Sequence, residues 1–155
     1  MSRPAVSIRR AVPEDQAFVF EAVKRLAAFD LPPSRSAREI WEGEARTLRA
    51  WFDDSVEGTL LVAERAADSL GFIFLEPHTD YFTLEEHGHV GILVVAEHAE
   101  GTGAGRALLE AGEAWAREQG YRRLTLNVFQ GNARARAVYD RLGFQVETIR
   151  YTKGL

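Results

Sequence analysis

Residues 94–106 read VVAEHAEGTGAGR: the end of an apolar strand, a glycine-rich turn and the start of a helix. The strand begins upstream at His89, because residues 89–96 form a near-continuous apolar run of the kind found in central strands. A helix that starts directly after such a turn exposes unpaired N–H groups and the positive end of its dipole. Glycine leaves those amides open, since no side chain stands in front of them. The stretch therefore predicts an anion site, and a glycine-rich loop without a ligand is the alternative.

Two common phosphate-binding patterns are excluded by the residues of this turn. A Walker A loop needs Gly-Lys followed by Ser or Thr, and the chain contains no such tripeptide. The dinucleotide fingerprint G-x-G-x-x-G needs a third glycine where Arg106 or Leu108 stands. An anion bound by this turn would therefore belong to another class of ligand.

The remaining sequence predicts an alternation of strands and helices around this turn. Strand-like stretches lie at residues 6–12, 59–65, 70–76, 89–96, 124–129 and 144–151. Helical periodicity marks residues 13–29, 36–52, 106–119 and 132–142, with Ser36 and Asn132 at cap positions. The order β-α-α-β-β-β-α-β-α-β predicts an α/β fold, a mixed central sheet with helices on both faces. No linker or repeat interrupts residues 1–155, so we expect a single domain.

The composition restricts the function classes further. The chain has 155 residues, 46% hydrophobic and 27% charged, as in one ordinary folded domain. Nineteen Lys and Arg against 23 Asp and Glu give a net charge of −4, which argues against nucleic acid as a partner. The absence of cysteine excludes disulfides, thiolate zinc sites and a cysteine nucleophile, and suits a cytoplasmic location. No stretch approaches the roughly 18 apolar residues of a membrane helix, so no membrane partner is expected.

Charge is unevenly distributed along the chain. Residues 76–100 contain six acids, all four histidines and no Lys or Arg. Residues 117–141 contain six Arg against two acids, a local charge of +4. The acidic stretch would attract a cation and the basic stretch an anion. The alternative is that both are solvated faces.

Downstream of the turn, further residues stand in a fixed order and spacing: Gly103-x-Gly105, the strand at 124–129, Asn132, Tyr139 and Gly143-Phe144. Together they resemble the pattern of the GNAT N-acetyltransferase superfamily. The resemblance is specific over residues 89–144 and looser over residues 8–15. It implies a GNAT-like sheet whose two central strands, 89–96 and 124–129, splay apart.

One residue departs from the family pattern. Glu100 stands where the family usually has Arg or Gln. A carboxylate near a pyrophosphate weakens binding unless it points outward or Arg106 compensates its charge.

The resemblance implies acetyl-coenzyme A as co-substrate and assigns residues to it. The pantetheine arm would pair with the first splayed strand through main-chain hydrogen bonds. Asn132 would cap its helix, contact the cofactor, or do both. The implied cofactor-binding residues are Leu93, Val94 and Val95 for pantetheine and Gly101, Gly103, Ala104, Gly105 and Arg106 for pyrophosphate.

The reaction implied is direct attack of a primary amine on the acetyl thioester in a ternary complex. Tyr139 fits the family position of the general acid that protonates the leaving thiolate. An ammonium acceptor must first lose a proton, and the acidic stretch offers several candidates for base or amine contact, with Asp80-Tyr81-Phe82 as an acceptor loop. These candidates are Glu76, Asp80, Glu86 and His89.

The histidine spacing matches no common ligand motif and the reaction needs no metal, so we expect no metal site. The resemblance leaves open whether the acceptor is a small molecule or a peptide, and it allows for a homodimer. Two alternatives to an acetyltransferase are an acyl-coenzyme A sensor without turnover and an interaction domain without ligand.

Overall fold

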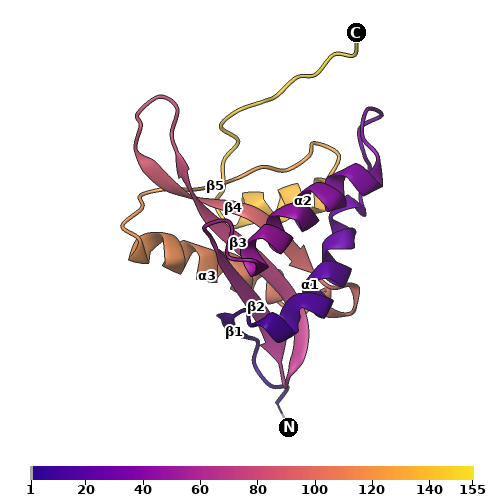
Figure 1. The fold of residues 1–155 in the computed structure, drawn as a ribbon, viewed down its shortest axis with the longest axis vertical. Coiled ribbons are helices and arrows are strands. Elements are labelled where there is room, and N and C mark those ends of the chain that lie inside the picture. Colours follow the sequence, from indigo (N-terminus) through magenta and orange to yellow (C-terminus); the bar gives the residue numbers. More distant parts are fainter. Residues whose placement is uncertain (1) are drawn as a thin grey trace.

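Five strands form one mixed sheet in the computed structural model, which describes residues 2–155 (Figure 1). The strand order is β1-β2-β3-β4-β5, so each strand lies beside its neighbour in sequence. The first four strands run antiparallel, whereas β5 runs parallel to β4. Their bounds are β1 Ser7–Arg10, β2 Thr59–Arg65, β3 Asp68–Thr79, β4 Glu86–Val95 and β5 Leu124–Leu126.

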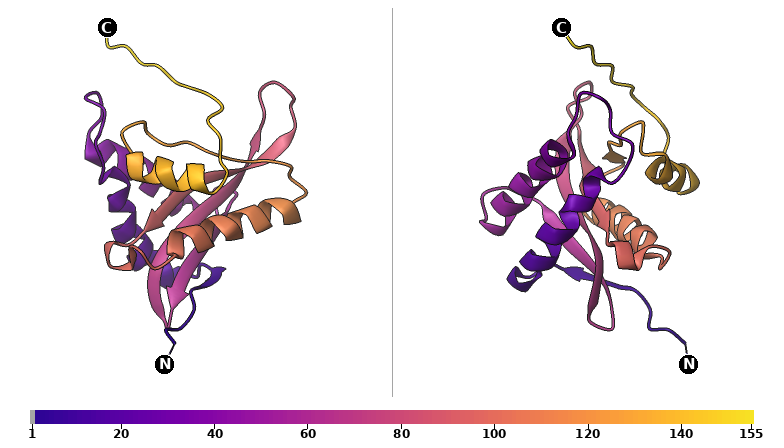
Figure 2. Two further views of the ribbon diagram at one scale, coloured as in Figure 1. Left: turned by 180° about the vertical axis from the view of Figure 1, so that it is seen from behind. Right: turned by 90° about the vertical axis from the view of Figure 1, so that its right-hand side faces the viewer.

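The helices cover both faces of this sheet, as the α/β prediction requires (Figure 2). On one face lie α1 Gln16–Ala22, flanked by short 3-10 turns at Pro13–Asp15 and Val23–Ala27, and α2 Ala37–Phe52. On the other lie α3 Ala104–Glu118 and α4 Ala133–Arg141. Among residues 2–155 no helix is long and apolar enough to span a membrane.

Each face of the sheet carries its own apolar core. Alternate residues of β3 supply the two sides, because successive strand side chains point to opposite faces. Phe72 and Phe74 pack with α1 and α2, and Ile73 and Leu75 pack with α3. Trp51 joins the first core and donates its indole N–H to the carbonyl of Gly58 at 2.9 Å.

Both predicted helix caps are confirmed. The Ser36 hydroxyl accepts from the Glu39 N–H at 3.2 Å, and the Asn132 side-chain oxygen accepts from the Ala135 N–H at 3.3 Å. Such bonds satisfy backbone donors that a helix start would otherwise leave unpaired. Asn132 therefore has a structural role in starting α4.

The predicted last strand, Phe144–Tyr151, is wrong: these residues form no strand. After α4 the chain runs away from the sheet in an extended path (Figure 1), and Val146 and Ile149 are each 73% exposed. Alternating residues suit a strand, but a strand also needs a neighbouring edge for its backbone hydrogen bonds. The nearest edge strand, β5, has three residues rather than the six predicted at 124–129.

Truncating Phe74, which is 1% exposed, removes a ring from the first core. We expect Phe74→Ala to lower the free energy of unfolding by about 3–5 kcal/mol, through lost burial and the cavity left behind. Urea denaturation measures the change. Phe82→Ala is the matched control because that ring is 86% exposed. Equal losses in both variants would contradict the assigned core.

Candidate active site

The two central strands separate after three paired positions. β4 pairs with β5 at Gly88, His89 and Val90, whose partners are Leu124, Thr125 and Leu126. Beyond Val90, β4 continues to Val95 without pairing to β5. On its other edge β4 contains a bulge at Gly91, because Leu75 pairs with Val90 and Phe74 with Ile92. A bulge bends its strand and increases the local twist. The predicted splay is therefore present, and it begins next to the bulge.

The bulge determines which backbone groups of β4 face the gap. The Ala96 N–H donates to the Leu70 carbonyl at 2.8 Å, so Ala96 faces the β3 side. Because successive residues face alternate edges, Val94 also faces β3, whereas Leu93 and Val95 face the gap. The Val95 carbonyl already accepts from the Arg25 side-chain Nε at 3.0 Å. Of the three residues predicted to bind pantetheine, Leu93 and Val95 present main-chain groups to the gap.

The glycine-rich turn leads from β4 into α3 with an open front. A Cβ built on Gly101 or Gly103 meets no atom within 4 Å, and both residues have positive φ, +75° and +87°. The Ala104 N–H bonds to the Thr102 hydroxyl at 3.3 Å. Within residues 2–155 no protein acceptor is found for four other backbone N–H groups, those of Gly101, Gly103, Gly105 and Arg106. These free donors at a helix start fit a pyrophosphate.

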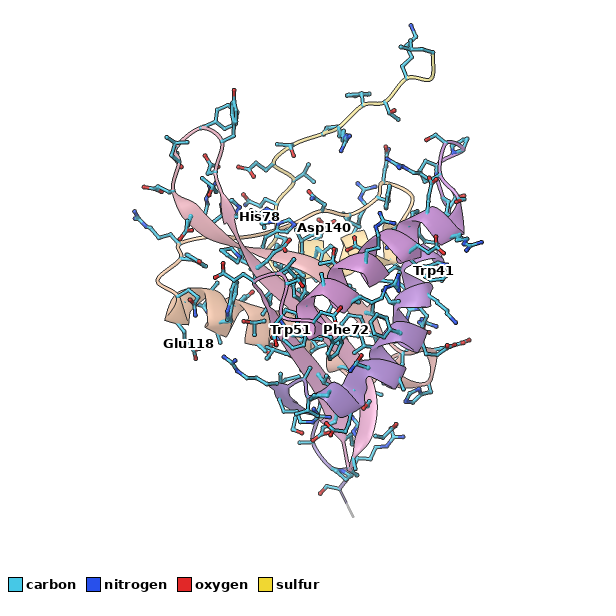
Figure 3. All side chains as sticks on the ribbon, viewed as in Figure 1. Trp41, Trp51, Phe72, His78, Glu118 and Asp140 are labelled. Carbon is cyan, nitrogen blue, oxygen red and sulfur yellow. The ribbon has the colours of Figure 1, made fainter. Side chains whose placement is uncertain are left out.

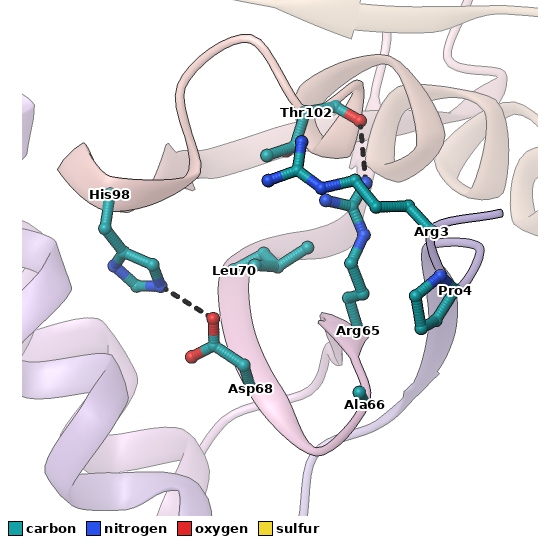
Figure 4. A pocket seen from close by; sticks show the side chains of 8 residues that line it. All are labelled: Arg3, Pro4, Arg65, Ala66, Asp68, Leu70, His98 and Thr102. Carbon is teal, nitrogen blue, oxygen red and sulfur yellow. Dashed lines mark hydrogen bonds and ion pairs between the residues drawn. The ribbon is translucent and has the colours of Figure 1, made fainter. Parts of the chain in front are cut away.

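The back of the turn is braced against the β2–β3 hairpin. Arg65 donates from Nη2 to the Thr102 carbonyl at 3.3 Å, and His98 pairs with Asp68 at 3.2 Å (Figure 4). Between these contacts lies a cavity of about 310 Å³, also lined by Arg3. The cavity lies on the hairpin side of the turn, and its polar contacts hold the turn in place.

Glu100, the departure from the family pattern, is neutralised by two arginines. Its Oε1 accepts from Arg25 Nη2 at 2.6 Å and lies 3.1 Å from Arg134 Nη1. These guanidiniums, Arg134 first, hold the pKa of the Glu100 carboxyl below its usual range. Arg106 does not compensate Glu100, because its Nε pairs with Glu110 at 2.9 Å. The carboxylate therefore adds little negative potential to the turn.

A cluster of histidines and acids lies beside the apex of the gap. Glu76 and His78 on β3 face His89 and His87 on β4 in register, and Figure 3 marks His78. The His78 Nε2 bonds to Glu76 Oε1 at 2.9 Å. Glu44 of α2 lies near enough to feel the Glu76 charge, because burial first and Glu76 second raise the pKa of its carboxyl. The cluster thus lies on the α2 face of the sheet.

His89 is the deepest member of this cluster, 7% exposed, and is held in one orientation. Its Nδ1 lies 2.7 Å from the Thr125 hydroxyl, which donates to the Gly88 carbonyl at 3.4 Å. A hydroxyl that donates to a carbonyl accepts from the ring, so Nδ1 carries the proton and Nε2 keeps a lone pair. Burial, followed by His78 and His87, lowers the pKa of His89 to about 4. His89 is therefore neutral near pH 7.

The ligand atoms of Glu76, His78 and His89 lie within 4.8 Å of one another, close enough to be tested as a metal site. However, the rings of His78 and His89 are stacked, with centroids 4.0 Å apart and planes 14° from parallel. Ring-nitrogen lone pairs lie in the ring plane, so two stacked rings direct them along parallel planes rather than at one ion. The stacked arrangement therefore argues against one ion shared by both rings.

Asp80 and Glu86 lie at the hairpin end of this cluster, beyond the His78–His87 pair. Asp80 Oδ2 accepts from Arg123 Nη2 at 2.8 Å, while Oδ1 accepts from the N–H groups of Phe82 and Thr83. These contacts, Arg123 first, hold the pKa of Asp80 far below its usual range. Glu86 is exposed at the first residue of β4. Tyr81 and Phe82 are each 86% exposed at the hairpin turn.

Tyr139 lies on α4 and packs against the second core, with its ring 5.8 Å from that of Phe144. Burial raises the pKa of its hydroxyl, which is therefore protonated near pH 7. The loop after the 3-10 turn at Val23–Ala27 contacts the loop after β5, because the ring of Phe29 lies 5.5 Å from that of Phe129.

Four residues that contact or act on the site lie outside the sequence-based candidates: Arg25, Glu44, Thr125 and Arg134. Arg25 acts on a loop 75 residues away, and Thr125 acts on a ring 36 residues away. Whether these residues meet their partners depends on strand register and on helix packing, for which the chain carries no local signal. Thr125 could have been suspected as the polar residue of its strand beside the H-x-H pair at 87–89.

A splayed mixed sheet with a glycine-rich turn of free amides between β4 and α3 defines the class of α/β domain to which this fold belongs. The model of the acetyltransferase (GNAT) family matches residues 20–144. The chain belongs to this family, which confirms the resemblance drawn from the sequence.

A curated relative and two solved structures that resemble this chain are also acetyltransferases. A mycothiol acetyltransferase of Amycolatopsis mediterranei (strain U-32) is 37% identical over 146 residues, which are 92% of this chain and 47% of that protein. The chain thus spans about half the length of the curated relatives it matches. Two solved structures share the fold with TM-scores of 0.70. One is aminoglycoside N-acetyltransferase AAC(6')-Iy in complex with CoA, which is 17% identical, and the match covers 98% of this chain and 97% of that chain. The other is ribosomal-protein-alanine N-acetyltransferase from Brucella melitensis biovar Abortus 2308, which is 20% identical, and the match covers 97% of this chain and 100% of that chain.

The buried neutral His89 makes stability depend on pH. The unfolded chain takes up a proton at a pKa of about 6.5, whereas folded His89 resists protonation down to about 4. The stabilising contribution is therefore complete above pH 6.5 and is lost as the pH falls towards 4. We expect a loss of up to about 3 kcal/mol across this window, measured by urea denaturation at each pH. His89→Gln should flatten the dependence, and the exposed His98→Gln should not; equal slopes in all three proteins would contradict this account.

Proposed function

We propose that the chain is an N-acetyltransferase that moves an acetyl group from acetyl-coenzyme A to a primary amine by direct attack in a ternary complex. The observation that carries the proposal is the unpaired edge of β4 leading straight into free amides at the start of α3. An extended amide-containing arm ending in a pyrophosphate matches that surface. Leu93 and Val95 would hold the arm, and the turn at residues 101–106 would hold the phosphates.

His89 is the base of the proposed reaction. An amine arrives largely as an ammonium, and its nitrogen must lose a proton before it can attack the thioester carbon. Nε2 of His89 keeps its lone pair and would accept that proton directly or through one water. Glu44 and Glu76 lie in the same cluster, and their carboxylates would attract the cationic acceptor. The acceptor class is therefore a small-molecule or peptide amine that carries positive charge.

Tyr139 is the acid of the proposed reaction. Acetyl-coenzyme A supplies an acetyl group activated as a thioester, so a thiolate leaves when the carbon–sulfur bond breaks. The Tyr139 hydroxyl gives its proton to that sulfur and regains one from solvent. Its raised pKa keeps the hydroxyl protonated before the step.

Thiol release from acetyl-coenzyme A with a panel of amines tests the activity. We expect Tyr139→Phe to lower kcat by about 10²-fold with an unchanged KM for acetyl-coenzyme A, because only the proton is removed. Tyr151→Phe is the control, since Tyr151 is 90% exposed. Binding of acetyl-coenzyme A without turnover of any amine would favour the sensor alternative over the enzyme.

The choice of base is tested by comparing His89→Gln with Asp80→Asn. We expect His89→Gln to lower kcat by about 10²-fold and Asp80→Asn to leave kcat within a few-fold, because Arg123 holds Asp80 away from proton transfer. The loss in His89→Gln should shrink at high pH, where more of the amine is already deprotonated. A large loss of kcat in Asp80→Asn alone would contradict this choice and identify Asp80 as the base.

A further inference from the structure

Arg134 connects two parts of the site that are distant in sequence. It is the second residue of α4, the helix that carries Tyr139, and its guanidinium lies 3.1 Å from Glu100 at the start of the glycine-rich turn. Its side chain is 72% exposed, whereas that of Arg25, the other partner of Glu100, is 29% exposed. The two arginines therefore hold Glu100 from an exposed and a half-buried side.

Arg25 is fixed by several bonds at once. Its Nε donates to the Val95 carbonyl at 3.0 Å, Nη2 donates to Glu100 at 2.6 Å, and Nη1 lies 3.7 Å from Glu97. Arg134 has a simpler environment, in which Glu100 is its ion-pair partner among residues 2–155. If Arg134 left, Arg25 would still neutralise Glu100. Arg134 can therefore change partners at small cost, and Arg25 cannot.

We infer that Arg134 is a phosphate ligand held in place by Glu100, and that it exchanges the carboxylate for the pyrophosphate of coenzyme A when the cofactor binds. This inference rests on the proposed function. Glu100 directly precedes Gly101, so the guanidinium lies one glutamate side chain away from the backbone of the turn that carries the free amides. A pyrophosphate offers more charge and more acceptor oxygens than one carboxylate that a second arginine already neutralises. The exchange would draw the first turn of α4, and with it the helix of Tyr139, towards bound cofactor.

Because of this exchange, substitutions of Arg134 and of Glu100 should change the affinity for coenzyme A in opposite directions. Removing Arg134 deletes a phosphate contact, so Arg134→Gln should weaken coenzyme A binding about tenfold. Removing the charge of Glu100 frees Arg134 in advance, so Glu100→Gln should tighten binding about threefold. A purely structural ion pair predicts weakening in both variants, because either substitution would loosen α4.

Isothermal titration calorimetry with coenzyme A measures these affinities without turnover. Arg141→Gln is the matched control, because it removes the same charge near the other end of the same helix. The double variant Arg134→Gln/Glu100→Gln should lose the gain of Glu100→Gln, since no guanidinium remains to be freed. Thermal unfolding without ligand should show all variants folded, as Arg134 lies at the surface.

Dephospho-coenzyme A, which keeps the pyrophosphate and lacks the 3′-phosphate, locates the contact. Arg134→Gln should weaken its binding by the same factor as for coenzyme A; a loss seen with coenzyme A alone would overturn the pyrophosphate assignment. If the wild type, Arg134→Gln and Arg141→Gln all bind coenzyme A with the same affinity, the exchange is overturned but the proposed function still stands. Wild-type protein that binds no coenzyme A would overturn both.

Discussion

The separation of β4 from β5 is the constraint on which the site depends. Parallel pairing stops at Val90, and the bulge at Gly91 lets β4 continue in the antiparallel sheet while its other edge is left open. An open edge inside a domain leaves strong backbone hydrogen-bonding groups without partners, and a bound ligand can supply them. The glycine-rich turn and the His89 cluster lie at the two ends of this opening, so one irregularity would position both the proposed cofactor and the proposed proton transfer.

Electrostatics divides the site into two regions with different tasks. Around the turn, Arg25 and Arg134 neutralise Glu100, so the free amides are the groups that would bind an anion. Around the apex, Glu44 and Glu76 collect negative charge next to a histidine that burial keeps neutral. The uneven charge of residues 76–100 is thus split between a cation-attracting cluster and a compensated loop.

Some elements were predicted within a residue or two, whereas β3 ends three residues after its predicted end at residue 76 and β4 begins three residues before its predicted start at residue 89. Ser36 caps α2, and β2 spans Thr59–Arg65 as the alternation indicates. The prediction was wrong where an element depends on a neighbour: the strand at 144–151 is absent and β5 is shorter than its pattern. A strand exists through its hydrogen-bonded partner, whereas a helix and its cap are satisfied within a few consecutive residues.

The sequence by itself determined the order of elements as far as α4, the glycine-rich turn and the family, because each depends on residue types at short fixed spacings. It also led to His89 as one of several candidate bases. Only the tertiary structure decided which charges meet: Arg25 reaches Glu100 across 75 positions, and Thr125 orients His89 across 36. Such contacts are decided by strand register and by the packing of helices on the sheet, and they determine whether a charged or titratable side chain is neutralised, buried or free to react.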